Sequence, residues 1–98
     1  MDREFYVYML SSGYYGTLYI GVTGDLLYRV RQHRSAEIPG FTEKYKVDRL
    51  VWYETHQYVR DAIMREKHLK HWNRAWKIEL INKSNPRWAD LYPALAGE

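Results

Sequence analysis

The sequence predicts a small α/β (α+β) domain in which a three-stranded, largely antiparallel sheet is flanked by helices in the order β-β-α-β-α-α. Three observations predict this class. Residues 5–10 and 18–22 are rich in aromatic and β-branched types, and the connection between them carries two glycines, as in a β-hairpin. Residues 50–54 form a third segment of the strand type. Residues 58–71 and 74–83 contain no Gly or Pro, which is typical of helices.

The remaining helix and the breaks follow from local chemistry. After the second strand, the Asp25 carboxylate is suited to accept hydrogen bonds from the free amides of a first helical turn, so we expect a helix from there to Arg34. The tripeptide Ile-Pro-Gly at 38–40 ends that helix, and residues 35–48 are predicted to be a loop.

The end of the chain is predicted to return to the core. Asn85-Pro86 stops the last helix, and the apolar residues that follow indicate that a tail of about 86–98 packs on the sheet domain. The 98 residues are enough for one modest core, so residues 1–98 are expected to form a single domain.

The composition excludes several classes of protein. A hydrophobic fraction of 46% with 16% aromatic residues indicates a folded globule and not a disordered chain. The absence of cysteine excludes disulfides and thiolate metal sites, and it fits a reducing, cytoplasmic location. No secretion leader and no apolar run of the roughly 20 residues that a membrane helix needs is present, so we expect no membrane partner.

Positive charge is concentrated in one segment. Residues 60–77 carry six cationic and two acidic side chains, a net charge of +4, against +3 for the whole chain. Aromatic residues such as Trp72 and Trp76 are interleaved with these charges, which favours a surface that follows a phosphate backbone. The structural alternative is an ordinary solvated helix face.

Two tyrosines are predicted to share one face of the sheet. Side chains alternate along a strand, so Tyr8 points away from the row of Val7 and Met9, and Tyr19 points away from the aliphatic residues of the second strand. Gly21, on the same face as Tyr19, leaves a gap where a ligand could approach the backbone. The alternative is an aromatic pair that only stabilises the sheet.

The helix after Asp25 adds two polar residues at a spacing of one turn. Arg29 and His33 stand at i and i+4, so they lie on one helix face. A guanidinium is suited to phosphate because it donates two parallel hydrogen bonds and stays charged. An imidazole is suited to proton transfer near neutral pH.

Glu66 falls within the apolar stripe formed by Val59, Ala62, Ile63 and Leu69. A carboxylate there requires a cation or hydrogen-bond donors. It could form an ion pair at the edge of the core, or it could bind a hard divalent cation. A single carboxylate is typical of Mg²⁺, which keeps several waters and also binds substrate phosphates.

Taken together, these residues resemble the GIY-YIG endonuclease superfamily, and in particular its small stand-alone members. The second signature motif is present as Tyr19-Ile20-Gly21, and the first is present as Tyr6-Val7-Tyr8, with Tyr6 in place of the leading glycine. Arg29, His33 and Glu66 fall where the family has an arginine, a histidine and a metal-binding glutamate. The resemblance extends over nearly the whole chain.

The resemblance implies hydrolysis of phosphodiester bonds with one Mg²⁺ or Mn²⁺ held by Glu66. Tyr19 would take a proton from the attacking water, directly or through His33, and Tyr8 would position that water or support the base. Arg29 would bind the phosphate and stabilise charge in the transition state. A phenol is a weak base, so this role needs positive charge close to Tyr19.

The resemblance also implies a nucleic-acid partner, DNA rather than RNA. The residues expected to bind it are Gly21, Lys67, Lys70, Arg74 and Asn85. The assignment of Asn85 remains open. Many members have an asparagine nearer the glutamate, and Asn82 is another candidate in this sequence. An asparagine before proline is also typical of a turn. The main alternative is a binding module that keeps the fold without cleavage. A structural or protein-interaction domain would leave Glu66 unexplained, and the oligomeric state is open.

Overall fold

The computed structural model describes residues 3–35, 37 and 40–98. Its elements follow in the order β1 (Phe5–Ser11), β2 (Leu18–Thr23), α1 (Leu26–Arg34), α2 (Phe41–Tyr45), β3 (Arg49–His56), α3 (Val59–His71), α4 (Arg74–Ser84) and α5 (Tyr92–Ala96). The predicted class and the order of the six main elements are confirmed.

Two short helices were not predicted. Residues 35–48 were expected to be a loop, but they contain α2, and α5 lies in the tail. Each is five residues long, which is too short for a helical period to be visible in the sequence. The break predicted at Ile38-Pro39 lies outside the described residues.

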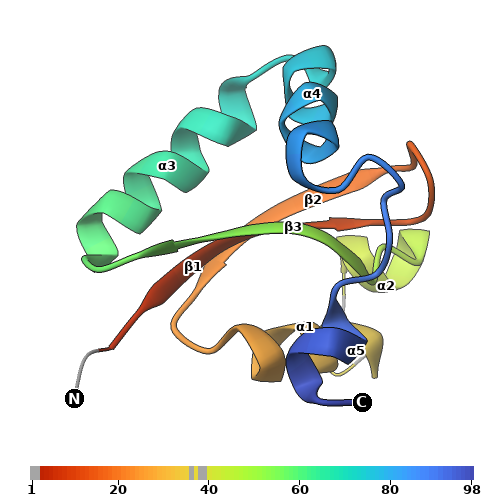
Figure 1. The fold of residues 1–98 in the computed structure, drawn as a ribbon, viewed down its shortest axis with the longest axis horizontal. Helices are drawn as coiled ribbons and strands as arrows, with labels where there is room; N and C mark the ends of the chain where they lie inside the picture. The colour runs from red at the N-terminus through yellow and green to blue at the C-terminus, as the bar shows by residue number, and fades with distance from the viewer. Residues whose placement is uncertain (1–2, 36, 38–39) are drawn as a thin grey trace.

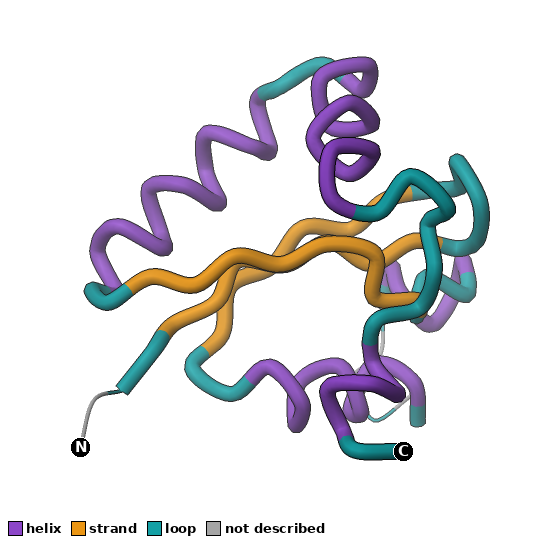
Figure 2. Tube along the Cα trace, in the orientation of Figure 1, coloured by secondary structure: helices purple, strands orange, loops and turns teal. Residues whose placement is uncertain are grey.

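The sheet has the order β2-β1-β3, with β1 in the centre and both pairs antiparallel. Helices α3 and α4 lie over one face, and α1, α2 and α5 lie over the other (Figure 1). Figure 2 shows the same arrangement, with the strands (orange) between two layers of helices (purple). Because β1 is paired on both sides, its side chains are the most enclosed of the three strands.

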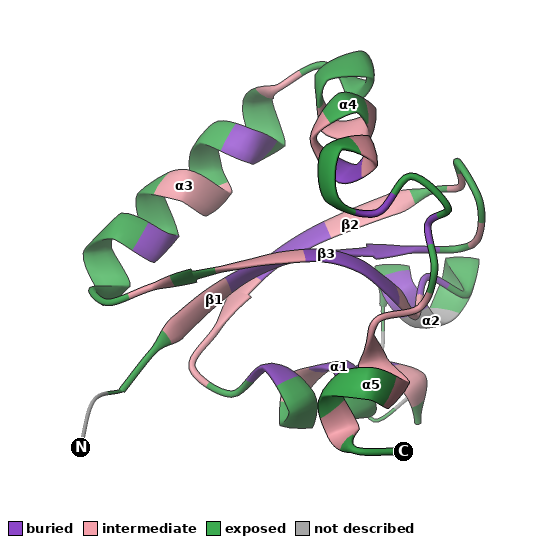
Figure 3. Cartoon of the chain, in the orientation of Figure 1, coloured by how far each residue is buried: buried purple, intermediate pink, exposed green. Residues whose placement is uncertain are grey.

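Buried residues run through the middle of the sheet (purple in Figure 3), and they belong to two separate cores. One core lies under α3 and α4, and its buried residues are Val7, Met9, Ile20, Val51, Trp52, Ala62, Leu69, Ile81 and Trp88. The other lies above α1, and its buried residues are Tyr8, Leu10, Leu26, Val30, Val47 and Leu50. The tyrosine face of β1 is therefore part of a second core and not an open surface.

A β-bulge in β3 changes which side chains of this strand point into each core. The register slips by one residue between Met9 and Leu10, which pair with Trp52 and Leu50. The intervening Val51 and its neighbour Trp52 both join the core under α3 and α4. A bulge places consecutive side chains on one face in this way and bends the strand.

Two helix starts have side-chain caps. The Asp25 carboxylate accepts a hydrogen bond from the Tyr28 amide at 3.2 Å, which confirms the predicted cap of α1. The Asn73 side chain accepts one from the Trp76 amide at 2.9 Å at the start of α4. Each cap satisfies an amide that the first turn leaves without a partner.

The C-terminal segment lies along β3. The Trp88 side chain is fully buried, and the Leu91 amide donates to the Leu50 carbonyl at 2.8 Å. Asn85 is also buried; its side-chain amide donates to the carbonyls of Val51 at 3.0 Å and Ala89 at 2.9 Å, and its oxygen accepts from the Ala89 amide at 3.0 Å. Asn85 therefore stabilises the turn after α4.

Within the described part of the chain, no helix has the length and the apolar character that crossing a bilayer requires.

We predict that Asn85→Ala lowers the free energy of unfolding by about 1–3 kcal/mol, because the buried Val51 carbonyl loses its donor. Urea unfolding measures the change. The control is Lys83→Ala, an exposed substitution two residues away, with an expected effect within about 0.5 kcal/mol. Equal stability of the two variants would contradict the structural role of Asn85.

Candidate active site

The site begins with the contact between Tyr8 and Gly21, which pair across β1 and β2. A Cβ placed on Gly21 would lie 2.5 Å from both Cζ and the hydroxyl oxygen of Tyr8. The tip of the Tyr8 ring therefore lies over β2, in the space that any other residue would fill. The predicted gap for a ligand beside Tyr19 was wrong, because Tyr8 occupies it.

The Tyr8 hydroxyl continues into a buried hydrogen-bond chain. It lies 3.2 Å from Nε2 of His33, and Nδ1 of His33 lies 2.9 Å from Oγ1 of Thr42. His33 is 4% exposed, so it is not a surface histidine: it follows Leu26 and Val30 along the buried face of α1. Each ring nitrogen has one hydroxyl partner, so the neutral ring donates at one and accepts at the other.

Thr42 is the member of this hydrogen-bond chain that was not predicted from the sequence. It lies in α2, within the segment predicted to be a loop, and it is buried. No local pattern relates position 42 to position 33, so only the tertiary structure reveals the contact. Thr42 connects α2 to the histidine and fixes the orientation of its ring.

Burial sets the protonation of both central groups. It raises the pKa of Tyr8 to about 12, and the neighbouring Tyr19 adds to this, whereas Arg29 acts in the opposite direction. Burial also lowers the pKa of His33 from its ordinary value of 6.5, and the positive charge of Arg29 adds to that effect. At neutral pH, Tyr8 is therefore protonated and His33 is uncharged.

Tyr19 and Arg29 stand at the border of this buried cluster, and both are partly exposed. The Tyr19 ring centroid is 5.2 Å from that of His33 and 6.3 Å from that of Tyr8. The Arg29 guanidinium donates to Oε1 of Gln32 at 3.3 Å. Tyr19 is thus the tyrosine that solvent and a substrate can reach, whereas Tyr8 is enclosed.

Glu66 lies on α3, which packs against β1 and β2. Its side chain is 15% exposed, between the buried Ala62 and Leu69. The stripe was predicted to include Val59 and Ile63 as well, but both are exposed, so it is narrower than predicted. The Glu66 charge is near enough to Tyr8 to contribute to the raised pKa of that phenol, which relates α3 to the tyrosine cluster.

The partner of Glu66 is a lysine. Oε2 of Glu66 lies 3.1 Å from Nζ of Lys70, one turn later in α3, and the Lys70 side chain is 51% exposed. Helix ion pairs at a spacing of i and i+4 contribute about 0.3–0.5 kcal/mol, so another cation can replace the lysine. No group of three or more His, Cys, Asp or Glu side chains arranged for a metal occurs among residues 3–35, 37 and 40–98. One accessible carboxylate fits a Mg²⁺ ion that keeps its other positions for water and phosphate.

The residues predicted to bind substrate are not all at this site. Lys67 is exposed on α3, and Lys70 is beside Glu66. Arg74 instead donates to the carbonyls of Tyr15 and Gly16 at 2.6 and 2.8 Å, so it holds the β1–β2 connection. Asn85 is buried against β3, at the opposite edge of the sheet from β2, so its predicted place in the substrate site does not fit the structure.

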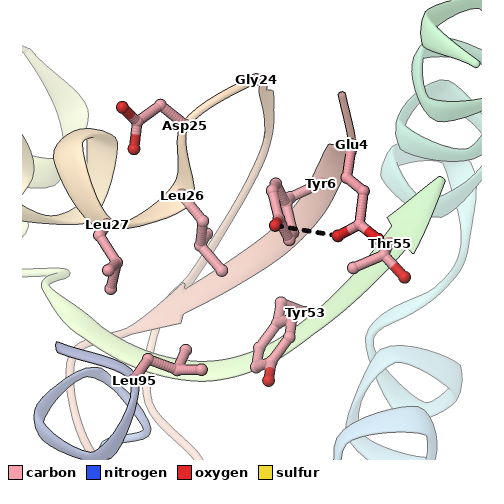
Figure 4. A pocket seen from close by; sticks show the side chains of 9 residues that line it. All are labelled: Glu4, Tyr6, Gly24, Asp25, Leu26, Leu27, Tyr53, Thr55 and Leu95. Atoms are coloured by element: carbon pink, nitrogen blue, oxygen red, sulfur yellow. Dashed lines mark hydrogen bonds between the residues drawn. The ribbon is translucent and has the colours of Figure 1, made fainter. Parts of the chain in front are cut away.

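A hollow of about 390 Å³ lies elsewhere, between the start of β1, the start of α1, β3 and α5 (Figure 4). Its two carboxylates already have partners: Glu4 accepts from the Tyr6 hydroxyl at 3.2 Å, and Asp25 caps α1. Tyr8, Tyr19, His33 and Glu66 are not among the residues that line it. The hollow is therefore separate from the candidate site.

The sequence profile of the GIY-YIG catalytic domain matches residues 4–79. The chain therefore belongs to the GIY-YIG family, which is a family of nuclease domains, and the resemblance inferred from the motifs is confirmed.

The chain is also similar to UPF0213 proteins over most of its length. The UPF0213 protein SERP0126 of Staphylococcus epidermidis RP62A is 30% identical over 83 residues, which are 85% of this chain and 99% of that protein. A UPF0213 protein of the S. epidermidis strain ATCC 12228 has the same identity and coverage. The solution NMR structure of the UPF0213 protein BH0048 from Bacillus halodurans has a TM-score of 0.56 and 26% identity, and the match covers 92% of this chain and 95% of that one.

We predict that Gly21→Ala destabilises the protein by about 1–3 kcal/mol, because the added methyl group must displace the Tyr8 ring from its place over β2. Urea unfolding measures the effect. Gly13→Ala is the matched control, because a Cβ there meets no atom within 4 Å. The account of Tyr8 would be wrong if the two substitutions had the same effect.

A second prediction concerns pH. Unfolded His33 takes up a proton near pH 6.5, whereas the folded protein resists protonation until a lower pH. The unfolded state therefore binds more protons in this interval, so stability is highest above pH 6.5 and falls as the pH drops toward the folded pKa. We expect that His33→Asn makes the fall in unfolding free energy between about pH 7.5 and about pH 5.5 smaller. An unchanged fall in the variant would show that His33 is not the responsible group.

Proposed function

We propose that this protein is a metal-dependent endonuclease that hydrolyses phosphodiester bonds in nucleic acid, DNA in preference to RNA, with one Mg²⁺ or Mn²⁺. The observation that carries the proposal is the meeting of three elements near β2, an edge strand of the sheet. Tyr19 comes from β2 itself, Arg29 and His33 from α1, and Glu66 from α3. Together, a phenol, a guanidinium and a carboxylate offer a proton acceptor, a phosphate-binding group and a metal ligand.

Glu66 would hold the metal, which supplies Lewis-acid catalysis at the scissile phosphate when it is bound. The partly buried position of Glu66 favours this role, because neighbouring apolar residues fix the side chain while one side remains accessible. Lys70 keeps the carboxylate ion-paired in the absence of substrate.

The exposure of each remaining residue indicates the role that it would have in catalysis. In its phenolate form, Tyr19 would accept a proton from the attacking water, because it is the accessible tyrosine beside His33. Arg29 would bind a phosphate oxygen and stabilise the charge that develops there. The buried Tyr8, held protonated, would act as a hydrogen-bond donor and hold His33 in position.

The surface around Glu66 supplies positive charge for the substrate backbone. Lys67 and Lys70 are exposed on α3 and would contact phosphates through charge. Gly21 would support the site indirectly, because it gives Tyr8 its place. Arg74 would contribute by fixing the β1–β2 connection.

Cleavage assays with Glu66→Ala test the proposal. Labelled duplex, branched and single-stranded DNA and RNA are incubated with Mg²⁺, Mn²⁺ or EDTA. We expect products from the native protein only with a divalent metal, and a loss of more than about 100-fold in rate in Glu66→Ala. The fold should persist, since the substitution removes a carboxylate whose ion pair contributes little.

Glu79→Ala is the matched control, because it removes an exposed carboxylate from α4, and it should cut at the native rate. Equal cleavage by native protein and Glu66→Ala would refute the role of Glu66. Salt-sensitive binding without products in every variant would instead indicate a nucleic-acid-binding module that retains the fold.

A further inference from the structure

Helix α2 presents two large aromatic rings to solvent beside the candidate site. Phe41 is 45% exposed and Tyr45 is 47% exposed, and they stand at i and i+4 on one face of the helix. Their ring centroids are 4.8 Å apart. The Phe41 ring is also stacked against Tyr19, at 6.4 Å between centroids and 30° between planes. Tyr19, Phe41 and Tyr45 thus form a continuous row, here called the aromatic row.

The exposure of these rings does not come from a loosely attached helix. The Thr42 side chain, next to Phe41, bonds to the buried His33, and the Val47 amide donates to the Thr42 carbonyl at 2.9 Å. Val47 itself is fully buried in the core above α1. The helix is therefore held in place from its inner side while its outer side keeps two rings in water, which marks a binding surface.

The aromatic row is bordered by positive charge. A hollow of about 240 Å³ lies beside it, and its lining residues are Leu18, Tyr19, Ile20, Phe41, Lys70 and Lys77. At the Tyr45 end of the row, the Lys44 ammonium lies 5.4 Å from the centroid of the Tyr45 ring. Proteins bind single-stranded nucleic acid by stacking bases on exposed aromatic rings while nearby cationic side chains contact the phosphates.

We propose that the aromatic row binds an unpaired nucleotide next to the bond that is cut. A base stacks on Phe41 and Tyr45, and Lys44 and Lys77 contact the flanking phosphates. The base must be unpaired, because both faces of a base inside a duplex are covered by its neighbours. This inference rests on the proposed function, because the aromatic row ends at Tyr19. It limits the substrate to single strands or to single-stranded ends and junctions.

Binding of a fluorescent oligothymidine and of a duplex of the same length tests this inference, with the native chain in EDTA so that no cleavage occurs. We expect the double substitution Phe41→Ala with Tyr45→Ala to weaken single-strand binding by about 5- to 150-fold, the range for loss of one stacked base. Duplex binding, which depends on charge, should change little. Phe41→Leu with Tyr45→Leu repeats the test with apolar side chains kept, and urea unfolding of each variant verifies that it is folded.

Tyr58→Ala is the matched control, because it removes an exposed tyrosine at the start of α3, and it should bind as the native chain does. A second readout is 2-aminopurine placed in the single strand, whose fluorescence should be quenched by the native protein and not by the double variant. Equal single-strand affinity of native and variant proteins would overturn the inference, whether or not the native protein cleaves. Loss of binding in the variant, with a native protein that cuts nothing, would refute the nuclease and retain the aromatic row.

Discussion

The ring of Tyr8 lying across Gly21 is the contact on which the rest of the site depends. Tyr8 belongs to the central strand, which is covered by helices on both sides, and its buried hydroxyl extends over β2 at Gly21. A glycine in β2 makes that path available. The hydroxyl then meets His33, whose other nitrogen meets Thr42, and α1 and α2 are fixed relative to the sheet by the same chain of hydrogen bonds. The glycine of the second motif therefore has a packing role in this fold.

Burial separates two tyrosines that the sequence presents as equivalent. Strand alternation places Tyr8 and Tyr19 on one face, and the register confirms it. Position in the sheet then gives them different chemistry: the central Tyr8 is enclosed and stays protonated, whereas Tyr19 on the edge strand remains accessible. Glu66 reaches the same edge from the opposite layer. Because β2 is an edge strand with helices on both sides, side chains from both helical layers can approach it.

Much of the fold could be predicted from the sequence, because strand composition, the Asp25 cap and uninterrupted helical segments are local signals. What could not be predicted depends on tertiary contacts. Helix α2 is too short for periodicity, so Thr42 and the aromatic row were missed. The side chains of Arg74 and Asn85 were expected to contact substrate, but both donate hydrogen bonds to backbone carbonyls of the protein. These carbonyls are distant in the sequence, so the contacts are visible only in the structure. An open gap was predicted beside Gly21. The Tyr8 ring that fills this space comes from another strand, so the contact is not visible in the local sequence.

The claim that Glu66 and the Tyr19 cluster form a single metal-assisted site at β2 is tested most directly by Mn²⁺ titration of the ¹⁵N-labelled protein. Paramagnetic broadening of amide signals reports closeness to the bound ion. We predict that broadening begins around Glu66 and extends to Tyr19 and Gly21 on β2, and that Glu66→Ala abolishes it. Broadening centred on Glu4 and Asp25, at the separate hollow of about 390 Å³, or broadening that survives Glu66→Ala, would contradict this claim.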